Sequence, residues 1–544
     1  MHRNTNVKAH DFAMVPQNNV PRSQFKSRSR HLTTFDAGYL IPHFVEEVWP
    51  GDHFHVKHTL FSRLATPIYP VMDNLYLDTF YYFVPFRLLW THWKNMNGEQ
   101  DNPSDSISYV TPQVASPTGG WPIGSIGDYM GLPTVGQVTA GHYKNTSALY
   151  LRAYNFIWNT CFRDENLQNS LTFNTGDGPD AASDYALKRR GKRFDYFTSA
   201  LPWPQKGATG VSVPIGGSAP VVPANGGAMQ FAGGSSSGTL ASLFTGISSN
   251  TLTYSGSNQS NVQMFYPTTV NLQTDLSAAT GVLINQLRQS IMIQEFLELD
   301  ARGGTRYVEY LRMHWATISP DFRQQRPEYC GGGSKLINFT PVTQLTATGA
   351  SGTSTPIGTQ SAFLVGVDRS GFSYASTEHG LIIGLIEVRA DLTYQQGVAR
   401  KFTRSTRYDY YDPAFAHLGN QAIRNDEIYC IGSATGGNSA GDQDIATFGY
   451  KEAWDEIRYF PSRVSSLFRS TAAGTLDGWH LAQKFTSLPT LSDTFIQDTP
   501  PLSRVLAVGT SANGQQFIGD FEYDITVARA APMFGIPHIS GMRI

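Results

Sequence analysis

The stretch FIGDFEYDITV, residues 517–527, decides the fold class of this chain. Its apolar side chains alternate with acidic ones, as in the run Phe521, Glu522, Tyr523, Asp524. Successive side chains of a β-strand point to opposite faces, so the alternation predicts a strand with one buried face and one face in water. IEVRADLTY, residues 386–394, alternates in the same way. Half-buried strands of this kind are typical of antiparallel sheets.

Strands are also expected at residues 52–65 and 71–85, separated by a Thr-Pro pair. The second becomes apolar on both faces at FYYFV, residues 80–84, which indicates a strand that is covered on both sides. Aromatic residues are frequent from 75 to 93, and almost no Lys or Arg is interleaved with them. We interpret them as packed core rather than as a surface for stacking bases.

Two helices are expected between the strand regions. Residues 150–161 repeat apolar side chains at helical spacing, and residues 277–302 form a second helix that Gly303 and Gly304 end. The composition of the 544 residues, with 51 Gly, 30 Pro and 12% aromatic residues, fits a β-rich chain with many loops. Strands separated by long excursions, with few helices, favour a β-sandwich or a jelly roll that carries large insertions.

Residues 207–274 contain no Asp, Glu, Lys, Arg or His, although 15% of the chain is charged. Gly, Ser, Thr, Asn and Gln dominate the stretch, yet apolar residues such as Val221 and Phe244 supply anchors that a plain linker lacks. We interpret it as a loop-rich β insertion that is displayed at a surface. The stretch therefore lacks the His, Asp, Glu and Lys side chains on which acid–base chemistry usually depends.

Residues 1–31 form a basic arm on a nearly neutral body. The whole chain has a formal net charge of -2, which gives no overall case for binding nucleic acid or a membrane. The arm itself can face phosphates or join subunits. Its basic residues are Arg3, Lys8, Arg22, Lys26, Arg28 and Arg30.

A second basic run lies at residues 188–193 and has two interpretations. It can hold phosphates, or it can be a loop that pairs with Asp184 and Asp195 or with a neighbouring subunit. The sequence leaves both open. The basic members of the run are Lys188, Arg189, Arg190, Lys192 and Arg193.

No motif nominates a catalytic site, a metal site or a cofactor. GSSSG, residues 234–238, matches a nucleophile elbow in form only, because it lies in Gly/Ser-rich sequence without ionisable groups nearby. On a strand, His53 and His55 share one face and His58 takes the other, so the three cannot converge on one zinc ion. The three cysteines are odd in number and far apart, which indicates a reducing compartment, and no signal peptide is evident.

Four blocks resemble the major capsid protein of the gokushovirus group of the Microviridae, which are small single-stranded DNA bacteriophages. They are TTFDAGYLIP (33–42), LATPIYPVMDNLYLDTFYYFVPFRLLW (64–90), SPDFRQQRPEYCGG (319–332) and EAWDEIRYFPSRVSSLFRS (452–470). The blocks extend from the arm to the C-terminal region and have no low-complexity explanation. The resemblance fails over residues 207–274, where that family carries a variable insertion.

This resemblance implies a single eight-stranded antiparallel jelly roll with large loop and helical insertions. It implies that sixty copies close a T=1 icosahedral shell around circular single-stranded DNA, with contacts at five-, three- and two-fold axes. Other virion proteins are implied as partners, and assembly is expected in a bacterial cytoplasm without membrane insertion. The insertion forms three-fold protrusions in that family, so it is expected to meet a host receptor through residues that include Tyr254, Phe265 and Tyr266.

Five regions are expected along the chain. They are a basic arm and extended segment (1–50), the first part of the jelly roll with a helical insertion (51–206), the uncharged insertion (207–274), helices and the remaining strands (275–400), and a C-terminal extension that packs on the barrel and on neighbouring subunits (401–544). Large aromatic and Arg side chains often carry interface energy. We therefore assign Trp454, Arg458, Tyr459 and Arg469 to packing and subunit contacts.

Two other classes of protein are considered. A jelly-roll glycan-binding or glycan-cleaving enzyme would need a carboxylate pair in a groove and would usually carry a secretion signal. A nucleic-acid-binding protein proper should be basic overall. The low charge favours a shell subunit, because interface cores are depleted in charged residues.

Overall fold

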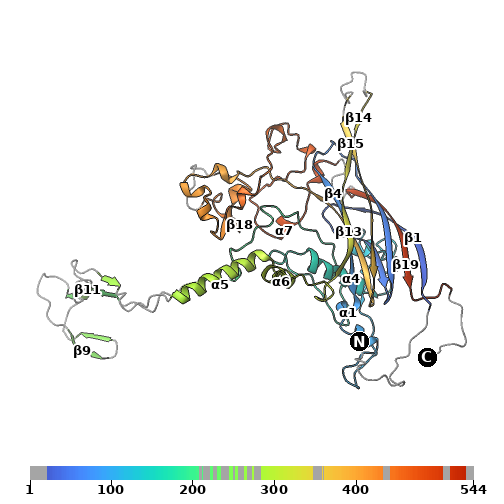
Figure 1. Ribbon diagram of the computed structural model, residues 1–544. Helices are drawn as coiled ribbons and strands as arrows, with labels where there is room; N and C mark the ends of the chain where they lie inside the picture. The colour runs from blue at the N-terminus through green and yellow to red at the C-terminus, as the bar shows by residue number, and fades with distance from the viewer. Residues whose placement is uncertain are drawn as a thin grey trace. The chain divides into compact units, whose positions relative to one another are not determined.

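The computed structural model describes residues 21–207, 284–346, 360–432, 442–506 and 515–534, residues 211 and 358, and the backbone of six short strands between residues 221 and 274. The chain divides into two compact units. One contains the residues up to Pro204 together with those from Ala301, and the other contains Gln205–Asp300. Figure 1 shows the elements of both units.

Two antiparallel sheets form a sandwich in the first unit. The five-stranded sheet has the order β1 (Ser23–Phe35), β19 (Phe517–Arg529), β3 (His53–Leu64), β15 (Gln360–Ala375) and β14 (Asn338–Thr343). The four-stranded sheet has the order β13 (Glu328–Leu336), β4 (Leu75–Pro85), β16 (Gly380–Ala390) and β2 (Ile41–Val48). The mainly β, antiparallel class that the sequence predicts is therefore confirmed.

The strands of the sandwich are hydrogen-bonded in nested pairs. β1 pairs with β19, β2 with β16, β3 with β15 and β4 with β13, so the first strand of the chain lies beside the last. Nested pairing of this kind across two sheets is the arrangement of a jelly roll. β14 stands outside the scheme, because it folds back on β15 at the edge of the five-stranded sheet.

A shared hydrophobic core fills the space between the two sheets. Leu60 of β3 and Phe521 of β19 pack there with Tyr81 of β4 and Ile386 of β16. The burial pattern of β19 alternates between buried and more exposed positions along most of the strand. The alternation at residues 517–527 therefore corresponds to one face on the core and one face in water. The half-buried strand expected from the alternation at residues 386–394 is wrong, because β16 is buried on both faces up to its end at Ala390.

The strands β4 and β16 are buried on both faces. Their outward side chains, among them Tyr82 and Ile383, pack in a second cluster with α4 (Leu149–Ile157), which continues into a π-helical turn at Trp158–Phe162. The prediction that FYYFV is covered on both sides is confirmed by its burial pattern. These aromatic side chains are core and present no stacking surface.

The other elements of the first unit are short. They are α1 (Phe86–Leu89), α2 (Trp93–Met96), β5 (Gln113–Val114), α3 (Ile126–Tyr129), β6 (Thr146–Ser147), α6 (Tyr307–Trp315), β17 (Asn420–Arg424), β18 (Thr447–Glu452) and α7 (Asp493–Ile496), with several 3-10 turns. The last three lie in the long connection from β16 to β19. A third cluster, with Phe197, Ile423 and Phe448, packs this connection.

The described part of the second unit contains hairpin ladders and a long helix. β7 (Val221–Pro223) pairs with β12 (Leu272–Thr274), β8 (Gln230–Gly233) with β11 (Val262–Phe265), and β9 (Phe244–Ser248) with β10 (Thr251–Tyr254). The ladders nest, so the β7–β12 pair brings the two ends of the stretch together. α5 (Ile284–Gly303) follows and ends at the predicted glycine, while the predicted start at residue 277 lies outside the described residues.

Candidate nucleic-acid and subunit interfaces

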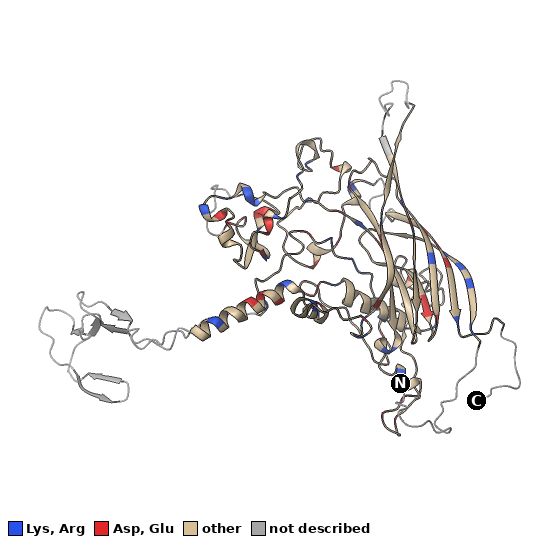
Figure 2. Ribbon diagram, viewed as in Figure 1, with Lys and Arg blue, Asp and Glu red and all other residues tan. Residues whose placement is uncertain are grey.

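The basic residues expected in an arm lie on an edge strand of the five-stranded sheet. Lys26, Arg28 and Arg30 occupy alternate positions of β1 and are exposed, and Arg22 precedes the strand. Figure 2 shows Lys and Arg along this strand. The segment from residue 23 is thus part of the sandwich. Two further candidates, Arg3 and Lys8, lie outside the described residues.

Side chains of β3 extend this basic face across β19. The register gives two rows of neighbouring residues, Lys26 with Thr526 and His55, and Arg28 with Asp524 and Lys57. All six line a cleft of about 480 Å³. The cleft contains three cations, one histidine and a single carboxylate, that of Asp524. Within the described ranges, Lys26, Arg28 and Lys57 form no ion pair. Such a cleft attracts anions, phosphate groups included.

Arg22 and Arg30 have partners inside the chain. Arg30 donates from Nε to Asp520 Oδ1 at 2.7 Å, and this hydrogen bond lowers the pKa of the Asp520 carboxyl. Arg22 donates to the backbone oxygens of Gly51 and Ala528. The charge of Arg30 is compensated and the donors of Arg22 are engaged, so Lys26 and Arg28 are the better candidates for phosphate contact.

His55 and Lys57 also belong to this face, which the sequence alone does not predict. The alternation of these residues with the buried Phe54 and Val56 is a signal that they share the exposed side of β3. That signal does not say which strand lies beside β3. Only the sheet order places β19 between β3 and β1.

His58 lies on the opposite, buried face of β3, as predicted. Its Nε2 lies 3.1 Å from Asp368 Oδ2 and 2.9 Å from Ser370 Oγ, and its Nδ1 lies 2.6 Å from the Tyr81 hydroxyl. In a nucleophilic triad the serine and the aspartate contact different ring nitrogens. Here they contact the same nitrogen, and the side chains of His58 and Asp368 are fully buried. The network satisfies polar groups inside the core.

The basic run at residues 188–193 is used inside the chain. Arg190 Nη1 lies 2.8 Å from Asp78 Oδ2 and 2.8 Å from Glu387 Oε2. Lys192 is buried and donates from Nζ to Gln483 Oε1 at 2.9 Å. Burial lowers the pKa of the Lys192 ammonium to about 8.

The other residues of the run also contact the chain, two through their side chains and Lys188 through its backbone. Arg189 donates to the backbone oxygens of Ala37 and Asp498, each at 3.1 Å. Arg193 Nη1 lies 3.1 Å from Asp391 Oδ1, and the backbone N–H of Lys188 donates to a tyrosine hydroxyl. Of the two interpretations, these contacts favour pairing within the chain, with acidic partners other than the expected Asp184 and Asp195.

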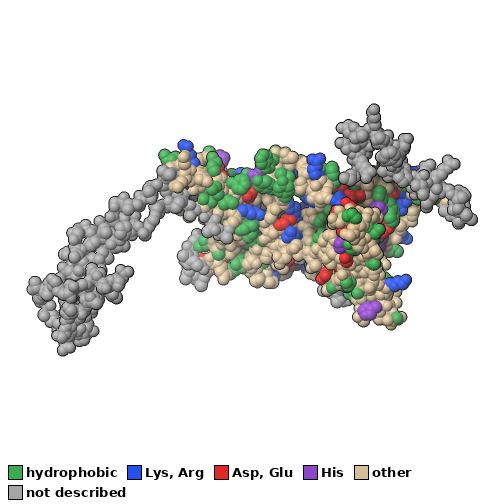
Figure 3. Space-filling view, turned by 90° about the horizontal axis from the view of Figure 1, so that it is seen from below, with side chains coloured by type: hydrophobic (Ala, Val, Ile, Leu, Met, Phe, Trp, Pro, Cys, Tyr) green, Lys and Arg blue, Asp and Glu red, His purple; other side chains and the backbone are tan. Residues whose placement is uncertain are grey.

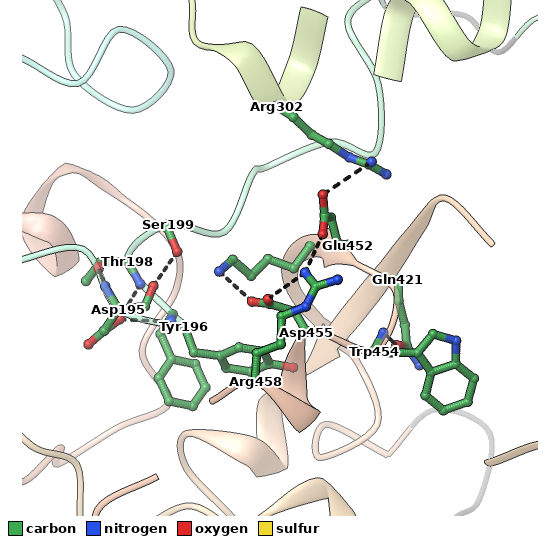
Figure 4. Close-up of polar contacts among 12 residues, drawn as sticks. Asp195, Tyr196, Thr198, Ser199, Arg302, Gln421, Glu452, Trp454, Asp455 and Arg458 are labelled. Atoms are coloured by element: carbon green, nitrogen blue, oxygen red, sulfur yellow. Dashed lines mark hydrogen bonds and ion pairs between the residues drawn. The ribbon is translucent and has the colours of Figure 1, made fainter. Parts of the chain in front are cut away.

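Of the four residues assigned to packing, Trp454, which Figure 4 labels, is buried and Tyr459 is half-buried against the third cluster. Trp454 is 4% exposed and donates from Nε1 to the backbone oxygen of Phe415 at 2.9 Å. Tyr459 stacks on Tyr196, with ring centroids 5.1 Å apart and an interplanar angle of 7°. Arg469 is exposed. The two aromatic residues therefore serve the packing of the subunit itself.

Arg458 belongs to a network of ion pairs that Figure 4 shows. Its Nη1 lies 2.6 Å from Glu452 Oε2, while Arg302 Nη1 lies 3.5 Å from the other oxygen of Glu452. Lys451 Nζ lies 2.6 Å from Asp455 Oδ2 beside them. Exposed pairs contribute little to stability, because water screens them. Contact of Arg458 with a neighbouring subunit stays a prediction.

Large apolar side chains are also exposed on the first unit. Trp315 at the end of α6, Phe322 and Tyr408 are examples. Figure 3 shows hydrophobic side chains interspersed with Lys and Arg over one face of the molecule. Exposed apolar surface of this kind marks interaction sites.

The aromatic residues assigned to host contact lie in the hairpin stretch. Tyr254 is the last residue of β10 and Phe265 the last of β11, and Tyr266 lies outside the described residues. Host contact through these residues stays a prediction.

The described parts of the chain hold no helix with the length and apolarity of a membrane span. They also hold no group of three or more His, Cys, Asp or Glu side chains that is arranged to bind a metal ion. The cysteines Cys161, Cys330 and Cys430 are free.

Comparison with known proteins identifies the family. Residues 13–539 match the family described as "Capsid protein (F protein)". The chain is 43% identical over 544 residues to Capsid protein VP1 of Bdellovibrio phage phiMH2K, with 98% of each chain covered. It is 39% identical over 594 residues to Capsid protein VP1 of Chlamydia phage 1, and 33% identical over 559 residues to that of Spiroplasma virus 4, again with 98% of each chain covered.

These relatives are structural proteins of virions, which confirms the resemblance carried by the four sequence blocks and removes the glycan-cleaving enzyme as an alternative. The chain is not an enzyme; it belongs to the F-protein family of phage capsid proteins.

Proposed function

We propose that sixty copies of this chain close a T=1 icosahedral shell around a circular single-stranded DNA genome, and that assembly takes place in the cytoplasm of a bacterial host. Membership of the capsid family supports self-assembly. The copy number and the genome rest on the gokushovirus resemblance. Contacts with other virion proteins and with a host receptor belong to the same proposal.

The observation that carries the proposal is the surface of α5. Leu287, Ile291, Met292 and Ile293 are between 42% and 66% exposed. At 3.6 residues per turn these four side chains point to different sides of the helix. A helix that is apolar on several sides needs cover from other protein. We infer that further copies of this chain supply the cover, at the three-fold axis expected for the insertion.

The exposed face of β1, β19 and β3 supports contact with DNA. Lys26, Arg28 and Lys57 lie in one cleft and have no acidic partner among the described residues within ion-pair distance. Contacts with backbone phosphates carry no sequence information. A shell that encloses an entire genome needs contacts of this sequence-independent kind.

The uncharged stretch at residues 207–274 supports a role in host attachment. It belongs to the compact unit Gln205–Asp300, which is distinct from the sandwich. Its Ser, Thr, Asn and Gln side chains are suited to hydrogen bonds with polar groups such as sugars. Shell closure is then the task of the sandwich and its long connections.

Sedimentation of particles purified from host cells, with negative-stain imaging, tests the shell. Closed particles should approach the mass of sixty 59.9 kDa chains plus that of the enclosed DNA. Replacing Ile291 and Met292 with Gln should stop assembly before closure while the sandwich stays folded by circular dichroism. Arg288→Gln on the same helix is the matched control. Closed shells at wild-type yield from the Ile291/Met292 variant would contradict the role of α5.

A further inference from the structure

A cleft of about 630 Å³ lies in the C-terminal region, away from β1. Residues 394–404 form one wall, residues 456–469 form the other, and Tyr196 and Phe197 contribute from a third segment. Its volume is within the range of roughly 300–1,000 Å³ in which pockets hold drug-sized ligands. The cleft therefore has room for nucleotides but not for a folded domain.

The cleft has an excess of positive charge. Its two carboxylates are already paired, since Arg400 Nη1 lies 3.5 Å from Glu427 Oε1 and Arg404 Nη2 lies 3.4 Å from Glu456 Oε1. Three further cations line the cleft, are exposed, and form no ion pair with any acid in the described ranges. They are Lys401, Arg463 and Arg469. An anionic ligand would find three uncompensated charges there.

Aromatic rings stand beside these cations. Phe460 is 87% exposed and Phe402 is 70% exposed, and both line the cleft. Tyr459, the neighbour of Phe460, is held in place by its stacking on Tyr196. Exposed rings next to unpaired cations are the two components of single-strand binding sites, where bases stack on the rings and phosphates meet the cations.

We propose that this cleft binds a segment of single-stranded DNA, with bases stacked on Phe460 and Phe402 and phosphates at Lys401, Arg463 and Arg469. The proposal rests on the proposed function, because it names a second place on the subunit where the enclosed DNA is held. It differs from the β1 face in kind, since the β1 cleft is lined by cations and a histidine but by no Phe, Tyr or Trp ring. Stacking accepts every base, so the cleft prefers single strands over duplexes without reading sequence.

Fluorescence anisotropy with the purified, unassembled chain and a labelled oligothymidylate of roughly ten nucleotides tests the cleft directly. Phe460→Ala should weaken binding about fivefold or more, the equivalent of removing the stacking of one base. The double variant Arg463→Gln/Arg469→Gln should lower the salt dependence of log K by about 0.7 for each phosphate that is no longer neutralised. Duplex DNA of the same length should bind less tightly.

Two matched controls separate the cleft from general surface effects. Phe194 is exposed outside the cleft, and Arg323 is exposed on another segment. Phe194→Ala and Arg323→Gln should bind the oligonucleotide as the wild type does. Unchanged affinity and salt dependence in the cleft variants would overturn the proposal.

Ultraviolet cross-linking of assembled particles, followed by mass spectrometry, provides a second measurement. Nucleotide adducts are expected on Tyr459 or Phe460. If Phe460→Ala prevents assembly but leaves oligonucleotide binding unchanged, the cleft holds a segment of a neighbouring copy and the proposal is wrong. Particles that close without DNA would contradict the proposed function instead, and the oligonucleotide measurement would still decide the cleft.

Discussion

Arg190 and Glu387 form an ion pair, with 2.8 Å between Nη1 and Oε2, where the basic run of residues 188–193 lies against the four-stranded sheet. Glu387 is fully buried, and burial raises the pKa of its carboxyl to about 7 even though Arg190 favours the charged form. The same guanidinium also contacts Asp78 on the neighbouring strand. One side chain therefore joins the run to two strands of the sandwich.

Arg190→Met should destabilise the chain by about 3–5 kcal/mol, because it leaves a buried carboxyl without its partner. Urea unfolding of the unassembled chain measures the change. Arg193→Met is the matched control, since its pair with Asp391 is more exposed and should be worth less than about 1 kcal/mol. Equal, small losses of stability in both variants would show that Arg190 has no special role.

Trp454→Ala should lower the free energy of unfolding by about 3–5 kcal/mol, because the indole is buried and its N–H is bonded to a backbone oxygen. Thermal unfolding and assembly yield measure the effect. Trp49, which is much more exposed, provides the control Trp49→Ala. A Trp454→Ala variant with wild-type stability and yield would remove the packing assignment.

Replacing Lys26, Arg28 and Lys57 by Gln in one triple variant should reduce the salt dependence of DNA retention by particles. Each cation that no longer meets a phosphate of single-stranded DNA lowers the slope of log K against log salt by about 0.7. Arg30→Gln is the control, because Asp520 already compensates that charge. If the triple variant packages and retains DNA as the wild type does, the β1 face serves subunit contacts only.

Replacing residues 224–271 with a short Gly/Ser turn should leave the sandwich folded and assembly-competent. The β7–β12 ladder holds the two ends together, with Val221 opposite Thr274, so closing a shorter loop costs little. The thermal midpoint should be unchanged, and adsorption to host cells should fall. Loss of soluble chain would place the stretch in the core, and normal adsorption would place attachment elsewhere.

Acid should destabilise the subunit through His43. Burial, with the nearby His58, holds the pKa of His43 well below its usual 6.5, and its Nδ1 lies 2.5 Å from the Tyr523 hydroxyl. As the pH falls below about 6.5, the unfolded chain takes up a proton at His43 and the folded chain does not. The contribution of His43 to the free energy of unfolding is therefore fully present above that pH and is lost below it.

The loss is about 1.4 kcal/mol per pH unit below 6.5 from this residue. Urea unfolding between about pH 7 and pH 5 measures the slope. Glu387, whose raised pKa makes the folded chain take up a proton below about pH 7, contributes with the opposite sign, so the His43 effect is the difference between two slopes. The slope of His43→Gln should differ from that of the wild type by this amount, and the slope of the exposed His53→Gln should not. A wild-type slope in the His43 variant would assign the acid sensitivity to other groups.

The sequence predicts this fold well where the signal is local. Alternation at residues 517–527 identifies β19, and the doubly apolar FYYFV identifies a strand covered on both sides, because both patterns depend only on the pleat of one strand. The ion-pair partners of Arg190 cannot be predicted in this way. Its partners Asp78 and Glu387 come from two strands that only the sheet order brings together.

The same limit applies to the basic face. His55 and Lys57 are visible as exposed positions of one strand, but their nearness to Lys26 and Arg28 depends on β19 lying between β3 and β1. Local pattern fixes which side of a strand a residue takes. Long-range pairing fixes its neighbours, and a single sequence does not display it.

The position of β19 has a consequence for synthesis on the ribosome. β1 is made first and has β19 as its neighbour in the sheet, yet β19 lies near the C-terminal end of the chain. During translation β1 therefore has no strand to pair with, and one edge of β3 is also open. Unpaired strand edges promote aggregation. Until residues 517–529 emerge, nascent chains can associate through these open edges. The yield of soluble subunit is therefore expected to depend on how quickly β19 inserts between β1 and β3, compared with the rate of this association.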